Sequence, residues 1–257
     1  MFSPLTGQIE LTLAESSACR SMPDAVTQCL SAALDEIGGQ SADVNNVAAL
    51  SVGDRQHLMR RLQIMLDGDA GWYSATCTKC HTDFDFQLQL SQLPVKTAGE
   101  GYPFVDVQTS VGMCRFRVPD GSDQSALSWL VDEEQNCAEL LRRCLLSIDG
   151  GQASEDIVFS AHDRATIEAA LEAVVPEICC EIGVSCLACQ ADNMVALNPY
   201  ALIGKSSAQI IPEIHKIAWY YHWGEDEILR MPRQRRQRYL DMIDASRGIG
   251  DISPGGS

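Results

Sequence analysis

The sequence contains two short cysteine pairs, Cys77-Thr78-Lys79-Cys80 and Cys186-Leu187-Ala188-Cys189, from which the rest of the chain can be aligned. Each is a C-x-x-C pair, and a shift of 109 residues places the first on the second. The same shift places Asp54 on Asp163 and Leu62 on Leu171, and it keeps apolar positions apolar while surface positions differ. We therefore predict that one structural unit occurs twice in this chain.

Both copies begin with a helical pattern. Residues 54–66 and 163–175 carry apolar side chains at helical spacing. Gly68 ends the first predicted helix and Pro176 ends the second. A helix therefore precedes each cysteine pair.

A β-hairpin is predicted around each pair. Residues 72–76 and 182–185 form short strands that lead into the cysteines, and residues 84–90 alternate apolar and polar side chains as a strand leaving the first pair. Each unit is thus a helix followed by a hairpin with two thiols at its tip.

Two such pairs supply four thiolates, the ligand set of a structural zinc ribbon. We expect Cys77, Cys80, Cys186 and Cys189 to hold one zinc ion, although the 105 residues between Cys80 and Cys186 exceed the usual ribbon loop. The alternatives are free thiols or redox use. A redox C-x-x-C opens a helix, which lowers the thiol pKa, whereas strand residues follow here. His81 is a possible substitute ligand or, as we prefer, a solvated turn residue.

The length and composition of the chain are typical of a globular protein. It has 257 residues, of which 46% are hydrophobic and 21% charged, enough to bury a core. Its net charge of −16 argues against binding nucleic acid or an anionic membrane over its whole surface. No stretch predicts a membrane span or a signal peptide. The eleven cysteines then indicate metal ligands and small packing residues in a reducing cytoplasm, not disulfides.

The segments outside the repeats differ from each other. Residues 1–50 predict a weak strand at residues 9–13 and a helix over residues 23–37. Residues 98–152 predict a small inserted α+β domain, in which the cysteines lie on apolar faces. We expect the cysteines outside the two pairs to be mostly buried.

The C-terminal segment is rich in aromatic residues and arginine. An aromatic helix begins near Pro212 and ends at Gly224, and further helices run to Ile243 before a flexible tail at residues 248–257. These helices either pack on each other or bind a partner, because aromatic and arginine residues concentrate binding energy. Truncation after Ile203 is expected to leave a folded body. The predicted partner-binding residues are Trp219, Tyr220, Trp223, Arg233, Arg235, Arg236 and Tyr239.

We therefore predict an α+β fold with duplicated helix–β-hairpin units joined by a zinc-ribbon-like knuckle pair. An inserted small α+β domain and a C-terminal helical segment complete it. The predicted segments are 1–50, 51–97, 98–152, 153–204 and 205–257.

Several motifs resemble the baseplate hub assembly protein family of T-even-type contractile tails, which also occurs in phage-derived contractile injection systems. The resemblance covers roughly residues 50–245, and the helix from Glu213 to Trp223 is its most specific part. The motifs are Val52-Gly-Asp-Arg55, the first C-x-x-C hairpin, Phe116-Arg-Val-Pro-Asp-Gly-Ser-Asp123, the second C-x-x-C leading to Leu197-Asn-Pro199, Glu213-Ile-His-x-Ile-Ala-x-x-Tyr-His-Trp223, Glu227-Ile-Leu and Arg235-Arg-x-Arg-Tyr-Leu240.

The resemblance implies a non-enzymatic assembly factor or structural component that binds other baseplate or tail proteins. It would act in the cytoplasm of the producing cell or within the assembled particle. No G-x-S-x-G, H-E-x-x-H or G-x-G-x-x-G motif is present, so no residue is predicted to be catalytic. The rival hypothesis is a zinc-ribbon nucleic-acid module that uses Arg233–Arg238 on phosphates, which the net charge disfavours.

Overall fold

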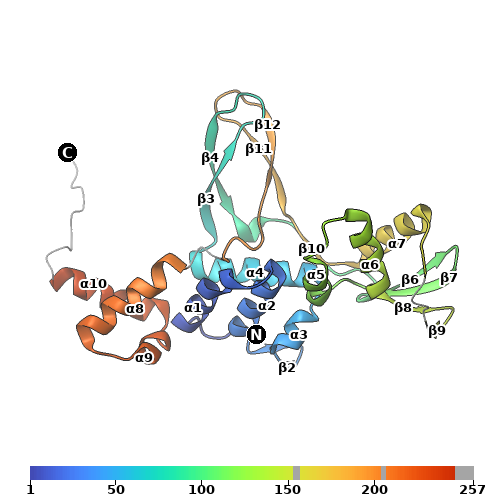
Figure 1. The fold of residues 1–257 in the computed structure, drawn as a ribbon. Coiled ribbons are helices and arrows are strands. Elements are labelled where there is room, and N and C mark those ends of the chain that lie inside the picture. The colour runs from blue at the N-terminus through green and yellow to red at the C-terminus, as the bar shows by residue number, and fades with distance from the viewer. Residues whose placement is uncertain (153–156, 204–206, 247–257) are drawn as a thin grey trace. The chain divides into compact units, whose positions relative to one another are not determined.

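The computed structural model describes residues 1–152, 157–203 and 207–246, and it confirms a mixed α+β fold with small antiparallel sheets (Figure 1). The chain divides into two compact units. We call Met1–Val44 with Ala201–Ser257 the terminal unit, and Asn45–Tyr200 the central unit. The two ends of the chain thus fold together, which the predicted segments did not anticipate. The predicted flexible tail lies outside the described residues.

The two repeat helices of the central unit begin in the same way. They are α4 (Val52–Asp67) and α7 (Ala161–Val174). Ser51 caps α4 by accepting from the backbone N–H of Asp54, and Ser160 caps α7 by accepting from Asp163. A serine at this position satisfies an N–H group that has no partner within the helix. Since each serine–aspartate pair is offset by 109 residues, the repeat extends to the helix caps.

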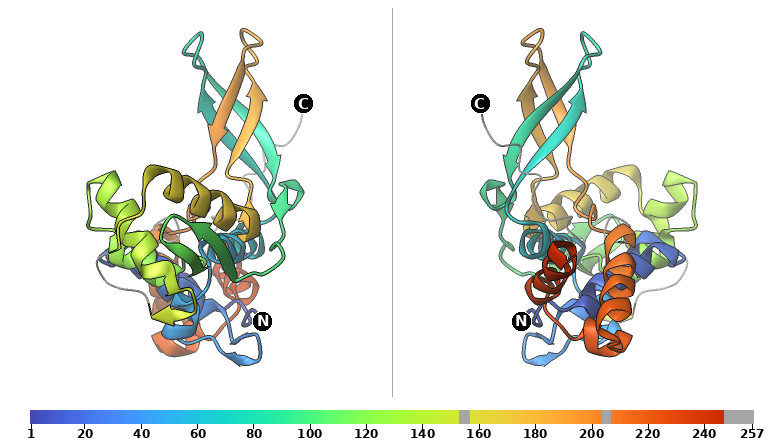
Figure 2. Two further views of the ribbon diagram at one scale, coloured as in Figure 1. Left: turned by 90° about the vertical axis from the view of Figure 1, so that its right-hand side faces the viewer. Right: turned by 90° about the vertical axis from the view of Figure 1, so that its left-hand side faces the viewer.

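The hairpins also match each other. β3 (Ala70–Thr76) pairs with β4 (Asp83–Gln89), and β11 (Glu181–Ser185) pairs with β12 (Asp192–Ala196), both antiparallel. Tyr73 lies opposite Phe86 in the first hairpin, and Ile182 lies opposite Val195 in the second. Because a slip of one residue would exchange the two faces, the same register presents the same face in both hairpins. Figure 2 shows the two hairpins side by side.

A four-stranded antiparallel sheet occupies the region predicted as an insert. Its order is β6 (Phe104–Thr109), β7 (Gly112–Arg117), β8 (Leu145–Ile148) and β9 (Gly151–Gln152). Between β7 and β8 the chain forms α5 (Gly121–Leu127) and α6 (Glu133–Cys144). Apolar residues of this sheet and of α6 share one core with Ile167 and Leu171 of α7. This segment therefore packs on the second repeat helix.

Two glycines allow close contacts at the start of α4. A Cβ atom on Gly53 would lie 1.7 Å from the carbonyl oxygen of Pro176, and one on Gly121 would lie 2.3 Å from the Arg55 guanidinium. Arg55 is fully buried and donates to the carbonyl of Val47. The first repeat continues through η2 (Leu90–Gln92) to β5 (Val95–Lys96), which pairs with β10 (Glu177–Ile178) directly after α7. The two repeats are therefore joined at their bases.

The terminal unit is mostly helical. Its core contains three isoleucines of α8 (Ile210, Ile214 and Ile217) together with residues of α1, α9 and α10. Among the described residues, no helix has the length and apolar character that a membrane crossing requires. Its elements are α1 (Gly7–Glu15), η1 (Ser16–Ala18), α2 (Met22–Ala33), β1 (Glu36–Ile37), β2 (Gln40–Ser41), α8 (Ser207–Tyr221), α9 (Glu225–Leu229) and α10 (Arg233–Ser246), and α3 (Val44–Ala48) follows at the boundary between the two units.

Three local predictions are wrong here. The predicted helix over residues 23–37 ends at Ala33, and Glu36–Ile37 form β1. Residues 9–13 form part of α1, not a strand, because Ile9 and Leu13 are spaced by four and both are buried. That spacing fits either a strand or one face of a helix. Pro212 lies inside α8 instead of near its start, since Ile210 is also buried in the core and extends the helix upstream.

Arg236 is fully buried, which corrects its prediction as a partner-binding residue. Its guanidinium forms ion pairs with Glu10 of α1 and with Glu213 of α8. It also donates to the carbonyl of Met231 at 2.9 Å. This network ties α1, α8 and α10 to each other. Truncation after Ile203 would remove α8 and α10 from this network, so we now expect the terminal unit of the truncated protein to unfold.

We expect Arg236→Met to destabilise the terminal unit by about 3–5 kcal/mol, because it leaves the buried Glu10 carboxylate without its closest partner. Chemical unfolding of the full chain measures this loss. The matched control is Arg238→Met on the exposed side of α10, which should change the unfolding free energy by no more than about 0.5 kcal/mol. Equal stability of the two variants would contradict the role of the network.

Candidate metal centre

The two hairpin tips have equivalent backbone structure. The N–H of Cys77 donates to the carbonyl of Thr82 at 3.0 Å, and the N–H of Cys186 donates to that of Ala191 at 2.8 Å. Each first cysteine also accepts at its carbonyl oxygen from the residue four positions later, His81 or Gln190. Those two residues have φ values of 57° and 59°, the left-handed region that closes a tight turn.

The tips bring four sulfur atoms together. The Cys77 and Cys189 Sγ atoms lie 3.6 Å apart, and those of Cys80 and Cys186 lie 3.8 Å apart. All four lie within 4.8 Å of one another, although they come from distant parts of the sequence. Sulfur atoms bound to one tetrahedral zinc ion at about 2.3 Å are about 3.8 Å apart. The predicted ligand residues therefore form a cluster that could hold one metal ion.

Backbone N–H groups favour the thiolate form at the first tip. The backbone N–H of Cys80 and then that of Lys79 point to Cys77 and lower its pKa to about 6. The hydroxyl and N–H groups of Thr82 lower the pKa of Cys80. Hydrogen bonds of this kind stabilise a charged sulfur directly. The first cysteine pair is thus prepared to ionise.

The second tip shows the cost of placing several thiolates together. The backbone N–H of Ala191 favours the Cys189 thiolate, but the sulfur of Cys80 and burial outweigh it and raise the pKa of Cys189 to about 11. Four thiolates cannot share this space without a compensating cation, because like charges at this distance repel strongly. A divalent metal ion removes that repulsion, so the donor set fits a metal centre.

Asn193 links the two tips and was not found from the sequence. It is buried on β12, where its Oδ1 accepts from the backbone N–H of Thr78 at 2.8 Å. Its Nδ2 lies 3.7 Å from the Cys77 Sγ and donates to the carbonyl of Ala191 at 2.8 Å. The 109-residue shift places Asn193 on Phe84, a buried apolar residue. That polar exception in the repeat is the signal that could have identified it.

His81 does not join the cluster. It occupies the left-handed turn position, is exposed, and corresponds to Gln190 in the second repeat. Its geometry agrees with the solvated turn residue that we preferred.

The other seven cysteines are less buried than expected. Cys29, Cys114 and Cys144 are buried, whereas Cys19, Cys179 and Cys180 are partly exposed and Cys137 is exposed, so the prediction that most are buried is wrong. All eleven thiols are free of disulfides. Cys137 is exposed because α6 buries only its last turns, at Leu141 and Cys144.

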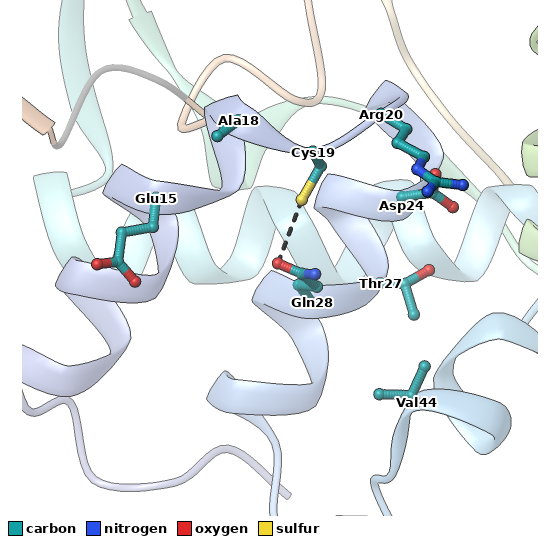
Figure 3. Close-up of a pocket in the computed structure, with 8 residues that line it drawn as sticks. All are labelled: Glu15, Ala18, Cys19, Arg20, Asp24, Thr27, Gln28 and Val44. Carbon is teal, nitrogen blue, oxygen red and sulfur yellow. Dashed lines mark hydrogen bonds between the residues drawn. The ribbon is translucent and has the colours of Figure 1, made fainter.

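The terminal unit has an open pocket beside one of these thiols (Figure 3). Its volume is about 510 Å³, and it is lined by residues of α1, η1 and α2 together with Cys19 and Val44. The Cys19 Sγ donates to Gln28 Oε1 at 3.2 Å. Burial and then the Asp24 carboxylate raise the pKa of this thiol. Cys19 therefore lacks the activation that a nucleophilic cysteine needs.

Apart from the buried Arg236, the predicted partner-binding residues divide into three groups. Trp219 and Arg235 are exposed, and the Arg235 guanidinium lies 5.9 Å from the centre of the Tyr239 ring. Arg233 is partly exposed and lies 3.8 Å from the Glu10 carboxylate. Tyr220, Trp223 and Tyr239 are half-buried and pack against the core of the terminal unit.

No protein-family model, curated protein or solved structure matches this chain significantly. The resemblance to baseplate hub assembly proteins therefore depends on the motifs of residues 50–245 alone.

We expect Asn193→Ala to weaken metal binding about 10–100-fold, because residues that hold metal ligands in place commonly have effects of this size. The variant removes the acceptor of the Thr78 N–H and the donor beside Cys77. Competition with a chromogenic chelator measures the affinity. Met194→Ala, an exposed neighbour on the other face of β12, is the control and should bind metal normally. Equal affinities would show that Asn193 does not support the site.

Proposed function

We propose that this protein is a non-enzymatic, zinc-containing assembly factor or structural component of the baseplate hub of a contractile tail or injection system. It acts by binding other proteins of the particle. The observations that carry the proposal are a row of side chains on the exposed side of α8, Ile211, His215 and Trp219, and two exposed arginines of α10, Arg235 and Arg238. A second support is the resemblance of the motifs in residues 50–245 to that protein family.

Zinc is the metal that the four-sulfur cluster favours. Tetrahedral sites made of four thiolates select zinc or iron–sulfur chemistry over hard cations such as magnesium or calcium. Two C-x-x-C pairs on facing hairpin tips are the arrangement of structural zinc ribbons. Four protein ligands fill the coordination sphere, so such an ion serves the fold and not a reaction.

The exposed row on α8 is suited to a protein partner. Ile211, His215 and Trp219 follow one another at four-residue spacing, and Ile211 and Trp219 are 57% and 69% exposed. The rings of His215 and Trp219 lie 6.3 Å apart. The charged residues of α8 are already paired within the terminal unit, Glu213 with Arg236 and Lys216 with Asp244. The row therefore offers apolar contact without an uncompensated charge.

The exposed arginines of α10 are fewer than the sequence indicated. Arg236 is buried and Arg233 lies near Glu10, so Arg235 and Arg238 are the exposed members of the predicted cluster. A partner with an apolar pocket and acidic groups beside it fits this surface. Two exposed arginines on a chain of net charge −16 give little potential for binding several phosphates, which disfavours the nucleic-acid alternative.

We expect elemental analysis of the purified full chain to find one zinc ion per chain. Cys186→Ala should abolish binding because it removes a buried ligand, whereas Cys114→Ala, a buried cysteine outside the cluster, should retain the metal. Iron with visible charge-transfer absorption, or no metal at all, would refute the zinc assignment.

We expect Trp219→Ala to weaken co-purification with co-expressed baseplate hub proteins at least 10-fold, because exposed tryptophans are frequent sources of binding energy. Arg235→Glu should weaken it as well. Both variants should unfold within about 0.5 kcal/mol of the parent, since both side chains are exposed.

The matched control for this experiment is Trp129→Ala, an equally exposed tryptophan of the central unit, which should bind normally. Loss of binding in the control alone would place the interface on the other unit. Tight DNA binding that falls steeply with salt would favour the rival function.

A further inference from the structure

Arg60 is a buried cation in α4, away from the thiol cluster. It is 6% exposed. Its Nη2 donates to the backbone carbonyl of Cys179, while its Nη1 has no hydrogen-bond partner. Among the described residues no carboxylate forms an ion pair with it. An arginine side chain remains protonated in proteins, so this site holds a full positive charge.

The neighbouring titratable groups do not neutralise that charge. Cys179, Cys180 and Tyr73 are the groups whose negative forms would favour the Arg60 cation. Burial raises the pKa of the Cys180 thiol and also that of Tyr73, which keeps both in their neutral forms. A buried charge without a counter-charge costs several kcal/mol, so this position calls for an anion from outside the chain.

Arg60 lines a small cavity that can receive such an ion. The cavity has a volume of about 20 Å³, and its other polar side chains are Gln63 and Asn198. Asn198 Oδ1 already accepts from the backbone N–H of Tyr200 at 2.9 Å, which leaves its amide NH₂ group as a donor. Asn198 is exposed, so the cavity has a route to solvent. The site thus combines unused donors with a positive charge.

The cavity lies where the two repeats meet. Leu90 and Leu197 line it, and they follow β4 and β12 directly. Arg60 comes from the first repeat helix and donates to Cys179, just before the second hairpin. An occupant would therefore contact both hairpin bases and α4 at once.

We propose that this cavity binds one small monovalent anion of halide size, chloride being the obvious candidate. The guanidinium of Arg60 and the amide of Asn198 supply charge-assisted and neutral hydrogen bonds to it. A cation is excluded by the arginine, and bulky anions are excluded by the volume. The ion stabilises the junction between the two repeats and leaves the protein-binding surface of the terminal unit unaffected.

Thermal unfolding of the metal-loaded full chain tests this binding. Chloride is exchanged for gluconate at constant sodium concentration, because gluconate is too large for the cavity. Above the dissociation constant we expect the melting temperature to rise by roughly 3–6 °C for each tenfold increase in chloride, as a ligand of the folded state requires. Arg60→Met should abolish the dependence, and Arg61→Met, at the exposed neighbouring position, should retain it. Equal chloride dependence in both variants overturns the proposal.

Anomalous diffraction from crystals that contain bromide tests anion binding in this cavity even if Arg60→Met does not fold. Crystals of the unmodified protein grown in sodium bromide should show an anomalous peak within about 3.5 Å of the Arg60 Nη1, a typical length for a hydrogen bond to a halide. A water molecule in the cavity, or bromide at surface arginines only, overturns the proposal.

Discussion

The central unit depends on four sulfur atoms that meet at the tips of two hairpins. The apolar core at the tips consists of three buried residues, Cys77, Phe84 and Cys186. Full burial of a phenylalanine contributes about 1.5–3 kcal/mol, whereas a structural zinc ion contributes on the order of 10 kcal/mol in small domains. Apolar packing alone therefore holds the tips together only weakly, and a metal ion bound by the four cysteines would provide the larger part of their association.

The long sequence separation of the two cysteine pairs would add to the stabilisation that a shared metal ion gives. Cys80 and Cys186 are separated by 105 residues, which include the four-stranded sheet and α5, α6 and α7. In the chain-entropy description, a cross-link that closes a loop of this length contributes about 4–5 kcal/mol. The repeat pairing of β5 with β10 closes the same loop at the hairpin bases. The tips and the bases thus fix the two hairpins at opposite ends.

The duplicated units share their N-caps and hairpin registers but differ in length and in side chains: α4 has 16 residues and α7 has 14, and β3 has 7 residues and β11 has 5. The caps, the hairpin registers and the turn residues agree between the copies. Three positions differ in a way that creates new contacts: Phe84 becomes Asn193, buried Arg55 becomes the partly exposed Arg164, and Arg60 becomes Ala169. The first and third differences place a polar group in one copy alone, and the second buries an arginine in one copy alone. Asn193 and Arg60 then act across the pair, so the two copies are complementary and not interchangeable.

The sequence alone determined the repeat, the helix–hairpin order and the four cysteines that cluster, because these follow from local spacing and from cysteine chemistry. Tertiary structure decided which distant residues share an interior. The sequence predicted Arg236 to be a partner-binding residue, yet it is buried and paired with Glu10 and Glu213. A cluster of arginines in the sequence does not reveal carboxylates that come from α1 and α8. Residues 9–13 likewise fit both a strand and a helix, and only the packing of α1 against α8 selected the helix. Local periodicity predicts where helices and strands form. Which side chains are buried depends on contacts with residues that are distant in the sequence.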